Sequence, residues 1–173
     1  MKKILILSLI SLLILLFSAQ ITFAEGENLI LEQPDSELII QNYEGEYEDG
    51  ESRWRSEGAM HSVDIKNRSE QDIVAYSITF MCFDVFNRTL GRPLDGYAIE
   101  TIESGKEINS RWNQRLSQAG LFKKYGTSIA YVSRIRFEDG TIWEYDSNII
   151  LEQVQEIEES LTVEDISAEQ GDN

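Results

Sequence analysis

The stretch IVAYSITFMCFDVF, residues 73–86, decides the fold, because it is the most apolar part of the body of the chain and is rich in β-branched and aromatic residues, which favour strands. Successive side chains of a strand point to opposite faces. One face carries Val74, Tyr76, Ile78, Phe80 and Cys82. The other begins with the polar Ser77 and Thr79 and ends with the apolar Met81, Phe83 and Val85. The sequence therefore predicts a central strand that is covered on both faces at one end.

Shorter strand patterns lie on both sides of this stretch. Residues 59–66 alternate apolar and polar side chains, which is the period of a half-buried strand. Further strands are predicted at residues 38–47, 94–102, 108–112 and 128–137. In the last of them we expect the inward side chains to be Ile129, Tyr131, Ile135 and Phe137. Strands at this spacing, with turn residues between them, favour an all-β fold, an antiparallel sandwich.

The last strand leads into a hairpin turn of sequence EDGT, and its register follows from the pattern. A two-residue loop would pair Ile135 with Glu144 and place a carboxylate on the core face. A three-residue loop ending at a left-handed Gly140 instead pairs Ile135 with Trp143 and Arg134 with Glu144. Because a one-residue slip reverses every side chain, the sequence predicts the second register, with Trp143 buried and a surface salt bridge.

Charge is segregated along the chain, which carries 31 Asp and Glu against 15 Lys and Arg, a formal net charge of −16. Residues 25–51 hold ten acidic and no basic side chains, residues 147–173 hold eight and none, and residues 52–146 hold 13 of each sign. We therefore predict an acidic leader at 25–51, the β-sandwich domain at 52–146, and an acidic amphipathic helix or tail at 147–173. We expect the acidic ends to be solvated, and binding of a cation or a basic partner is the alternative.

The N-terminus follows the three-part plan of a secretory signal peptide. Two lysines precede an apolar run over residues 4–17, and the small residues Thr22 and Ala24 follow it. We expect cleavage after Ala24, which removes residues 1–24 and leaves a secreted or extracytoplasmic protein of a bacterium, without stable insertion in the membrane. The alternative is an N-terminal membrane anchor, because residues 4–23 are long enough to cross a bilayer.

The period changes near the C-terminus. Apolar residues recur there at steps of four, three and four, which is one face of a helix: Ile150, Val154, Ile157 and Leu161. Ser147 or Asn148 could cap this helix. The four apolar side chains either pack on the sandwich or contact a partner, and we expect packing up to Leu161 and a partner contact or disorder beyond it. Trp54, which lies between two arginines, is a further possible partner contact.

A motif within the central strand resembles that of a known family. The match rests on residues 66–69, 80–84 and 104–107. Phe80 and Asp84 match the Phe and Asp of the bacterial FxLYD-like secreted domains, whereas Cys82 stands at their Leu and Phe83 at their Tyr. The third segment has Ser where the family turn has Pro, and the whole match covers residues 59–112. The resemblance implies an immunoglobulin-like β-sandwich outside the bacterial cell, and it carries no catalytic residues.

The composition excludes several classes of function. A strongly acidic protein lacks the basic surface that nucleic acids require. A single cysteine, Cys82, permits no intramolecular disulfide, and a single histidine, His61, permits no two-histidine metal motif. We expect both side chains to be structural: Cys82 on the apolar face of its strand, and His61 on the same side of its strand as Val63 and Ile65. The sequence thus predicts no catalytic residue, no metal ligand and no cofactor.

Two classes of function remain. The first is a non-catalytic binding or cell-envelope-associated module whose partner is an unknown protein or envelope component. The second is a small secreted hydrolase that uses His61 with a carboxylate, and a third, related possibility is an inhibitor that presents the loop 87–98. A His61 beside a Ser or Asp in a pocket would favour the hydrolase, and a dry His61 would favour the binding module.

Overall fold

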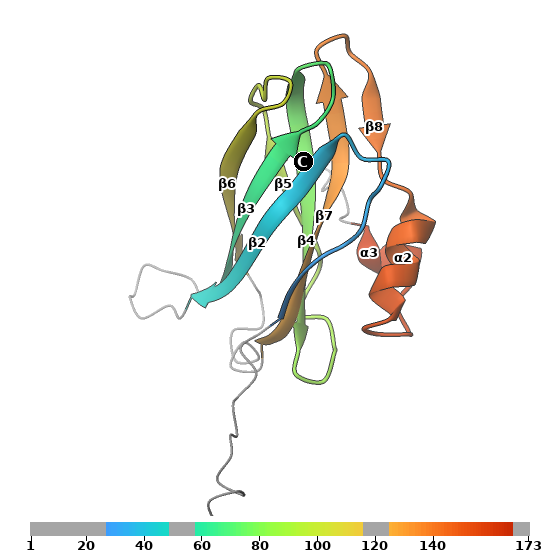
Figure 1. Ribbon diagram of the computed structural model, residues 1–173. Coiled ribbons are helices and arrows are strands. Elements are labelled where there is room, and N and C mark those ends of the chain that lie inside the picture. Colours follow the sequence, from blue (N-terminus) through green and yellow to red (C-terminus); the bar gives the residue numbers. More distant parts are fainter. Residues whose placement is uncertain (1–26, 49–57, 116–124, 168–173) are drawn as a thin grey trace, which may run out of the picture.

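The computed structural model describes residues 27–48, 58–115 and 125–167 (Figure 1). The strands are β1 (Glu27–Ile30), β2 (Leu38–Glu48), β3 (Gly58–Asn67), β4 (Ile73–Asp84), β5 (Leu94–Ala98), β6 (Glu107–Arg115), β7 (Tyr125–Phe137) and β8 (Ile142–Glu144). The helices are α2 (Ser147–Gln155) and α3 (Val163–Ile166). The predicted signal peptide, 1–24, and Trp54 lie outside the described residues. Within those residues, no helix combines the length and the apolar character needed to cross a membrane.

The strands form two sheets that pack face to face, so the fold is an all-β sandwich, as the sequence predicts. One sheet has the order β2-β3-β6, and the other has the order β1-β7-β4-β5, with β8 also paired to β7. All pairs are antiparallel except β1 with β7, which are parallel. The sandwich is therefore antiparallel, as predicted, except at the edge strand β1. This strand lies about a hundred residues before β7 in the chain, so no tight hairpin dictates its direction.

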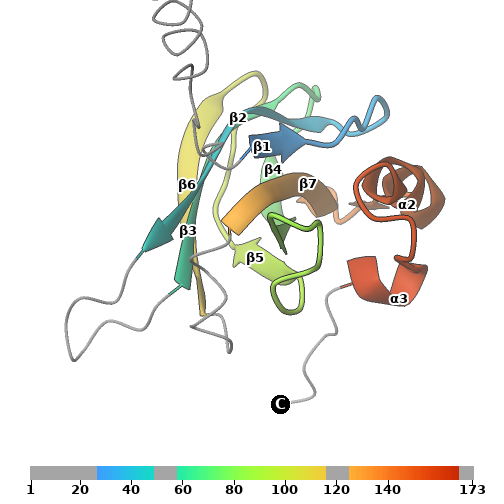
Figure 2. The same cartoon turned by 90° about the horizontal axis from the view of Figure 1, so that it is seen from below.

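Helices α2 and α3 form a third layer on the outer face of the sheet that contains β4 and β7 (Figure 2). The core between the two sheets is built from both of them: Leu38, Tyr43, Val63, Ile65, Ile73, Tyr76, Ile78, Phe80, Ile102, Ala130, Val132, Ile135 and Phe137. A second core fills the space under the helices: Leu31, Met81, Phe83, Ile129, Tyr131, Ile150, Val154, Leu161 and Ile166. Strand β4 is thus covered on both faces where Met81 and Phe83 lie, as predicted.

The sandwich begins before the predicted boundary at residue 52. Both β1 and β2 lie in the stretch that the charge count assigned to an acidic leader. The reason is visible in β2, where Leu38 and Tyr43 are buried while the acidic Glu44 and Glu46 are exposed. The carboxylates occupy the solvent side of a strand whose other side packs into the core.

The C-terminal helix docks on its own sheet. Ile150 and Val154 are buried under α2, so these side chains are interior residues and do not offer the predicted partner contact. The helix ends at Gln155, and the chain then turns, so Ile157 is half-buried and Leu161 buried from a loop rather than from the same helix. After Leu161 the chain continues into α3, so the expected disorder is wrong for the described residues up to Ser167.

Two hydrogen bonds stabilise the two ends of this helical region. The N-cap is Asp146 rather than Ser147 or Asn148, and its carboxylate accepts a hydrogen bond of 2.8 Å from the backbone N–H of Asn148. At the other end, Ile166 of α3 is fully buried, and its carbonyl oxygen accepts a hydrogen bond of 2.5 Å from the hydroxyl of Tyr131 on β7.

The hairpin between β7 and β8 has the predicted register. Ile135 lies opposite Trp143 and Arg134 opposite Glu144, with 2.7 Å between the guanidinium and the carboxylate. Gly140 is left-handed, with a φ of 88°. Trp143 is only half-buried, however, because β8 has three residues and covers the margin of the core rather than its centre.

A β-bulge in β7 changes which side chains point inward. Ser77 of β4 lies opposite Arg134 and Ile78 lies opposite Val132, so Ser133 is an extra residue in β7. Ile135 therefore faces the core between the sheets as predicted, and so does Phe137. The other two residues that were expected to point inward, Ile129 and Tyr131, lie beyond the bulge and face the helices instead.

Candidate functional site

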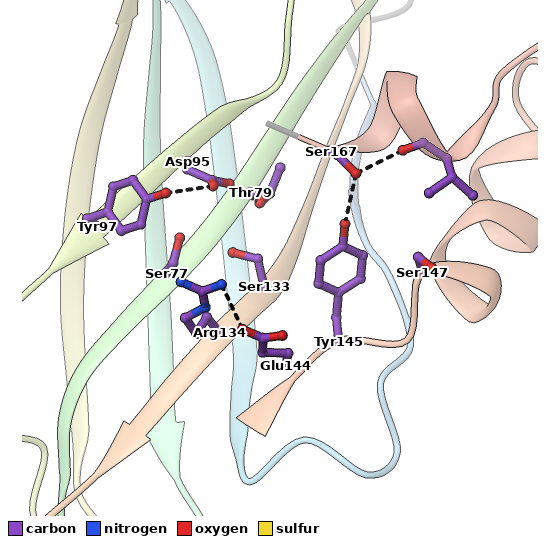
Figure 3. A pocket seen from close by; sticks show the side chains of 11 residues that line it. Ser77, Thr79, Asp95, Tyr97, Ser133, Arg134, Glu144, Tyr145, Ser147 and Ser167 are labelled. Atoms are coloured by element: carbon purple, nitrogen blue, oxygen red, sulfur yellow. Dashed lines mark hydrogen bonds and ion pairs between the residues drawn. The ribbon is translucent and has the colours of Figure 1, made fainter. Parts of the chain in front are cut away.

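A polar pocket opens on the outer face of the β4–β7 sheet, beside the helices (Figure 3). Its cavity has a volume of about 370 Å³. The sheet provides the floor and one side, and the chain from β8 to the end of α3 provides the other side. The lining residues are Ser77, Thr79, Asp95, Tyr97, Ser133, Arg134, Glu144, Tyr145, Ser147, Val163 and Ser167. Hydroxyl groups are the commonest chemical group among them.

Two buried serines form the floor of the pocket. Ser77 comes from β4 and is 2% exposed, and Ser133 comes from the bulge of β7 and is 8% exposed. Both hydroxyl groups point into the space between the two sides of the pocket (Figure 3). Neither hydroxyl oxygen has a hydrogen-bond partner within the part of the chain that the structure describes. Buried hydroxyls are normally paired, so two adjacent exceptions in one pocket call for an explanation.

Strand β5 supplies the acidic side of the pocket. Thr79 on the neighbouring strand donates a hydrogen bond to one carboxylate oxygen of Asp95, and the hydroxyl of Tyr97 donates to the other at 3.0 Å. Partial burial, followed by the nearby charge of Asp95, raises the pKa of the Tyr97 phenol, so this hydroxyl keeps its proton. The Tyr97 side chain is 57% exposed and is available at the mouth of the pocket.

The opposite side combines an ion pair with a second tyrosine. The guanidinium of Arg134 lies 2.7 Å from the carboxylate of Glu144, and both side chains are partly open to solvent. The hydroxyl of Tyr145 lies 3.4 Å from that of Ser167, which donates to the carbonyl oxygen of Val163 at 2.9 Å. Tyr145 therefore stands between the sheet and the helices at the side of the pocket (Figure 3).

The chemistry of these groups suits binding. Hydroxyls donate and accept hydrogen bonds, tyrosine rings offer flat apolar surface, and Asp95 is a carboxylate that no lysine or arginine lining this pocket pairs. Among the residues of the described ranges, no three His, Cys, Asp or Glu side chains gather closely enough to hold a metal ion.

His61, which the sequence predicts to be structural and which the alternative hydrolase hypothesis would use for catalysis, lies elsewhere, between the two sheets. It is fully buried, and its ring stacks on Phe80 with 4.4 Å between the ring centroids. Its Nε2 lies 2.9 Å from Oε1 of Gln114, which can only accept, so Nε2 carries the proton. The hydroxyl of Tyr43 then donates to Nδ1 at 2.9 Å.

Burial controls the chemistry of this histidine and of the cysteine near it. Desolvation lowers the pKa of His61 to about 4, although the hydrogen bond with Gln114 acts in the opposite direction. Burial likewise raises the pKa of the Cys82 thiol to about 12, which leaves it unreactive at neutral pH. The Cys82 thiol lies 3.6 Å from the same Gln114 oxygen. Both residues are therefore neutral members of a buried network.

The segment 87–98, expected as a presented loop, is only partly a loop. Its second half is strand β5, and Leu90 in its first half is buried, with its N–H bonded to the carbonyl oxygen of Cys82 at 2.7 Å. Asp84 holds the turn by accepting from the side chain of Arg88 at 2.6 Å and from the N–H of Phe86 at 2.8 Å.

One feature of the sequence points to the pocket. Ser77 and Thr79 are polar residues at the start of the second face of an otherwise apolar strand, where the helices do not cover the sheet. Asp95 and Tyr97 lie on the neighbouring strand in direct register, Asp95 opposite Thr79 and Tyr97 opposite Ser77. Ser133 reaches the pocket because of the bulge in β7, and Ser167 because the chain reverses after α2. Neither the bulge nor the reversal can be predicted from a local sequence pattern.

Comparisons with known proteins give only distant likenesses. No protein-family model and no curated protein matches the sequence. The X-ray structure of a hypothetical protein from Peptoclostridium difficile 630 aligns with 72% of this chain and 92% of its own, at 12% identity and a TM-score of 0.48. The X-ray structure of the Northeast Structural Genomics Consortium target SoR45 aligns with 62% of this chain and 79% of its own, at 15% identity and a TM-score of 0.38. Both are too distant to bear on function.

Proposed function

We propose that this chain is a secreted, non-catalytic binding module of the bacterial cell envelope, and that it binds a small polar ligand in the pocket on the outer face of the β4–β7 sheet. The proposal takes up the signal-like N-terminus and the resemblance of the body to FxLYD-like, immunoglobulin-like domains. A membrane-anchored form that keeps residues 4–23 would place the same pocket outside the cell.

One observation carries the proposal: the unpartnered hydroxyls of Ser77 and Ser133 at the floor of the pocket. An unsatisfied buried polar group costs about 1–3 kcal/mol, and an alanine at either position would avoid that cost. Two serines that weaken the fold and point into one cavity are typical of a site shaped for a ligand.

The surroundings of His61 support binding over hydrolysis. A catalytic base needs a substrate proton within reach and an orienting group, commonly a carboxylate. Both ring nitrogens of His61 are engaged, by Tyr43 and by Gln114, and the ring is enclosed between the sheets. A neutral, enclosed histidine has a structural role in the core of a binding module.

The test is cosedimentation of the purified mature chain with the insoluble envelope fraction of the source bacterium. We expect the wild type to sediment and the double variant Ser77→Ala, Ser133→Ala to stay in solution. The matched control is Ser36→Ala. Ser36 is also buried, but it donates a hydrogen bond of 2.6 Å to the carbonyl oxygen of Leu38 and does not line the pocket.

The control variant separates binding from folding. Ser36→Ala loses a hydrogen bond worth about 1 kcal/mol and should still sediment, whereas the double variant should keep or gain stability and lose binding. Sedimentation of the double variant at the wild-type level would show that the pocket is not the binding site. The intact mass of the exported protein tests the predicted removal of the signal peptide, since a chain that begins at Met1 contradicts cleavage before Glu25.

A further inference from the structure

We propose that the ligand of this pocket is a neutral, hydroxyl-rich ring, a saccharide unit. The inference rests on the proposed binding function and adds the chemical class of the ligand to it. Three properties of the pocket point to the same class: the kind of hydrogen-bonding groups on its floor, the sign of its charge, and the aromatic residues on its two sides.

The floor of the pocket suits a ligand that both donates and accepts hydrogen bonds. The hydroxyls of Ser77 and Ser133 each have one proton and two lone pairs, and both lack a partner in the described chain. A ligand with acceptors alone, such as a phosphate, would leave the lone pairs of both serines unused. A ligand with donors alone, such as an ammonium group, would leave their protons unused. Two neighbouring ligand hydroxyls can satisfy a serine in both directions, because one accepts its proton and the other donates to its oxygen.

The charge of the pocket disfavours anions. It contains two carboxylates, Asp95 and Glu144, and one guanidinium, Arg134, which is already paired with Glu144. The charge that remains is that of Asp95. Its two oxygens accept from Thr79 and Tyr97, and each keeps a further lone pair that is suited to a ligand hydroxyl.

The sides of the pocket suit a flat, partly apolar ring. Tyr97 stands on one side and Tyr145 on the other (Figure 3). Aromatic side chains present an apolar face together with a polar hydroxyl, which matches the C–H faces and the hydroxyl rim of a sugar ring. The cavity of about 370 Å³ is small for a binding pocket, so one or two such rings would fill it.

The experiment is a nuclear magnetic resonance titration of the ¹⁵N-labelled mature chain with four neutral sugars: glucose, galactose, mannose and N-acetylglucosamine. We expect saturable shifts of the backbone amide signals of the pocket with at least one of them. The uronic acid form of the same sugar, which carries a carboxylate, then tests the preference for a neutral ligand. The uronic acid should bind at least about fourfold more weakly than the neutral sugar, which is the effect of one carboxylate at roughly 5 Å in water.

The variants used for envelope binding give the control. The double variant Ser77→Ala, Ser133→Ala should lose the saturable shifts, and Ser36→Ala should keep them. An excess of the sugar that binds should also release the wild type from the envelope sediment if the saccharide belongs to the envelope. Binding without release would identify a free sugar as the ligand.

Three results would overturn the inference. They are the absence of saturable shifts with all four sugars, equal or tighter binding of the uronic acid, and unchanged sugar binding by the double variant. If the first occurs while envelope binding still depends on Ser77 and Ser133, the pocket binds another class of ligand and the proposed function stands. If envelope binding does not depend on these serines, the proposed function fails together with the saccharide.

Discussion

Acidification from pH 8 to pH 5 should lower the free energy of unfolding by about 2 kcal/mol through His61 alone. The side chain is completely buried between the sheets and stacked on Phe80. Desolvation lowers its pKa from 6.5 to about 4, against the weaker opposing effect of the hydrogen bond with Gln114. The unfolded chain therefore takes up a proton below pH 6.5, whereas the folded protein does not do so until about pH 4.

The sign and size follow from this difference. The stabilisation is complete above pH 6.5 and is lost as the pH falls toward the pKa of the folded state. A difference of 2.5 pKa units corresponds to a total of about 3.4 kcal/mol, of which about 2 kcal/mol is lost by pH 5. Such a loss is a large part of the stability of a small domain, which is typically about 5–15 kcal/mol.

The assay is urea unfolding of the mature chain at pH 8, 7, 6 and 5, beside the variant His61→Gln. The comparison of slopes removes the contribution of the carboxylates, which is common to both proteins. We expect the wild type to lose about 2 kcal/mol more than the variant over this range. Equal slopes would refute the reasoning.

A direct measurement serves if the variant does not fold. The chain has one histidine, so its ring signals in a nuclear magnetic resonance spectrum are assigned without ambiguity in an untagged protein. Titration of His61 near pH 6.5 in the folded state would show that the ring is solvated and would remove the basis for the predicted loss of stability.

Three further predictions concern stability and share one assay, urea unfolding at pH 7.5. Gly140→Ala should cost on the order of 1 kcal/mol, because its φ is 88° and a new Cβ meets no atom within 4 Å, and an unchanged midpoint would contradict a left-handed turn. Gly96→Ala should cost more, roughly 1–3 kcal/mol, because its Cβ would lie 2.7 Å from the ring of Trp112, and a smaller cost than at Gly140 would contradict this packing. A stop after Asp146 removes four buried side chains, Ile150, Val154, Leu161 and Ile166, worth roughly 6–12 kcal/mol, so the truncated chain should not unfold cooperatively, and a sharp transition would contradict docking of the helices.

Most strands and the hairpin register could be predicted because their physical causes are local. Side chains alternate along β3 and β4, and the turn before β8 admits one loop length that keeps Glu144 out of the core. The two apolar faces at the end of β4 also predicted that Met81 and Phe83 would be covered on the outer side of the sheet. In each case the pattern of one or two neighbouring segments contains the decisive information.

The acidic leader shows how a count of charges can mislead. The charge of a segment says nothing about the face on which the charges lie, and in β2 the acidic residues alternate with buried ones. The prediction of one continuous C-terminal helix, with Ile150, Val154, Ile157 and Leu161 on one face, is wrong for a related reason. The spacing of Ile157 and Leu161 continues that of Val154, yet the helix ends at Gln155, and these two residues reach the same apolar cluster through a turn. The spacing of these apolar residues therefore predicted their packing on the sheet correctly, but not the length of the helix.

The pocket depends on a feature that alternation cannot reveal. If β7 alternated strictly inward from Ile135, Ser133 would point into the core and Tyr131 would follow it there. The bulge at Ser133 instead places that residue on the outer face, beside Arg134 and Ser77, and it turns Tyr131 toward α3. One extra residue thus places Ser133 in the floor of the pocket, and it also directs the hydroxyl of Tyr131 to the carbonyl oxygen of Ile166 at the end of α3. Because bulges re-aim side chains in this way beside binding sites, the position of Ser133 beside Ser77 and the contact of Tyr131 with α3 have a single structural origin.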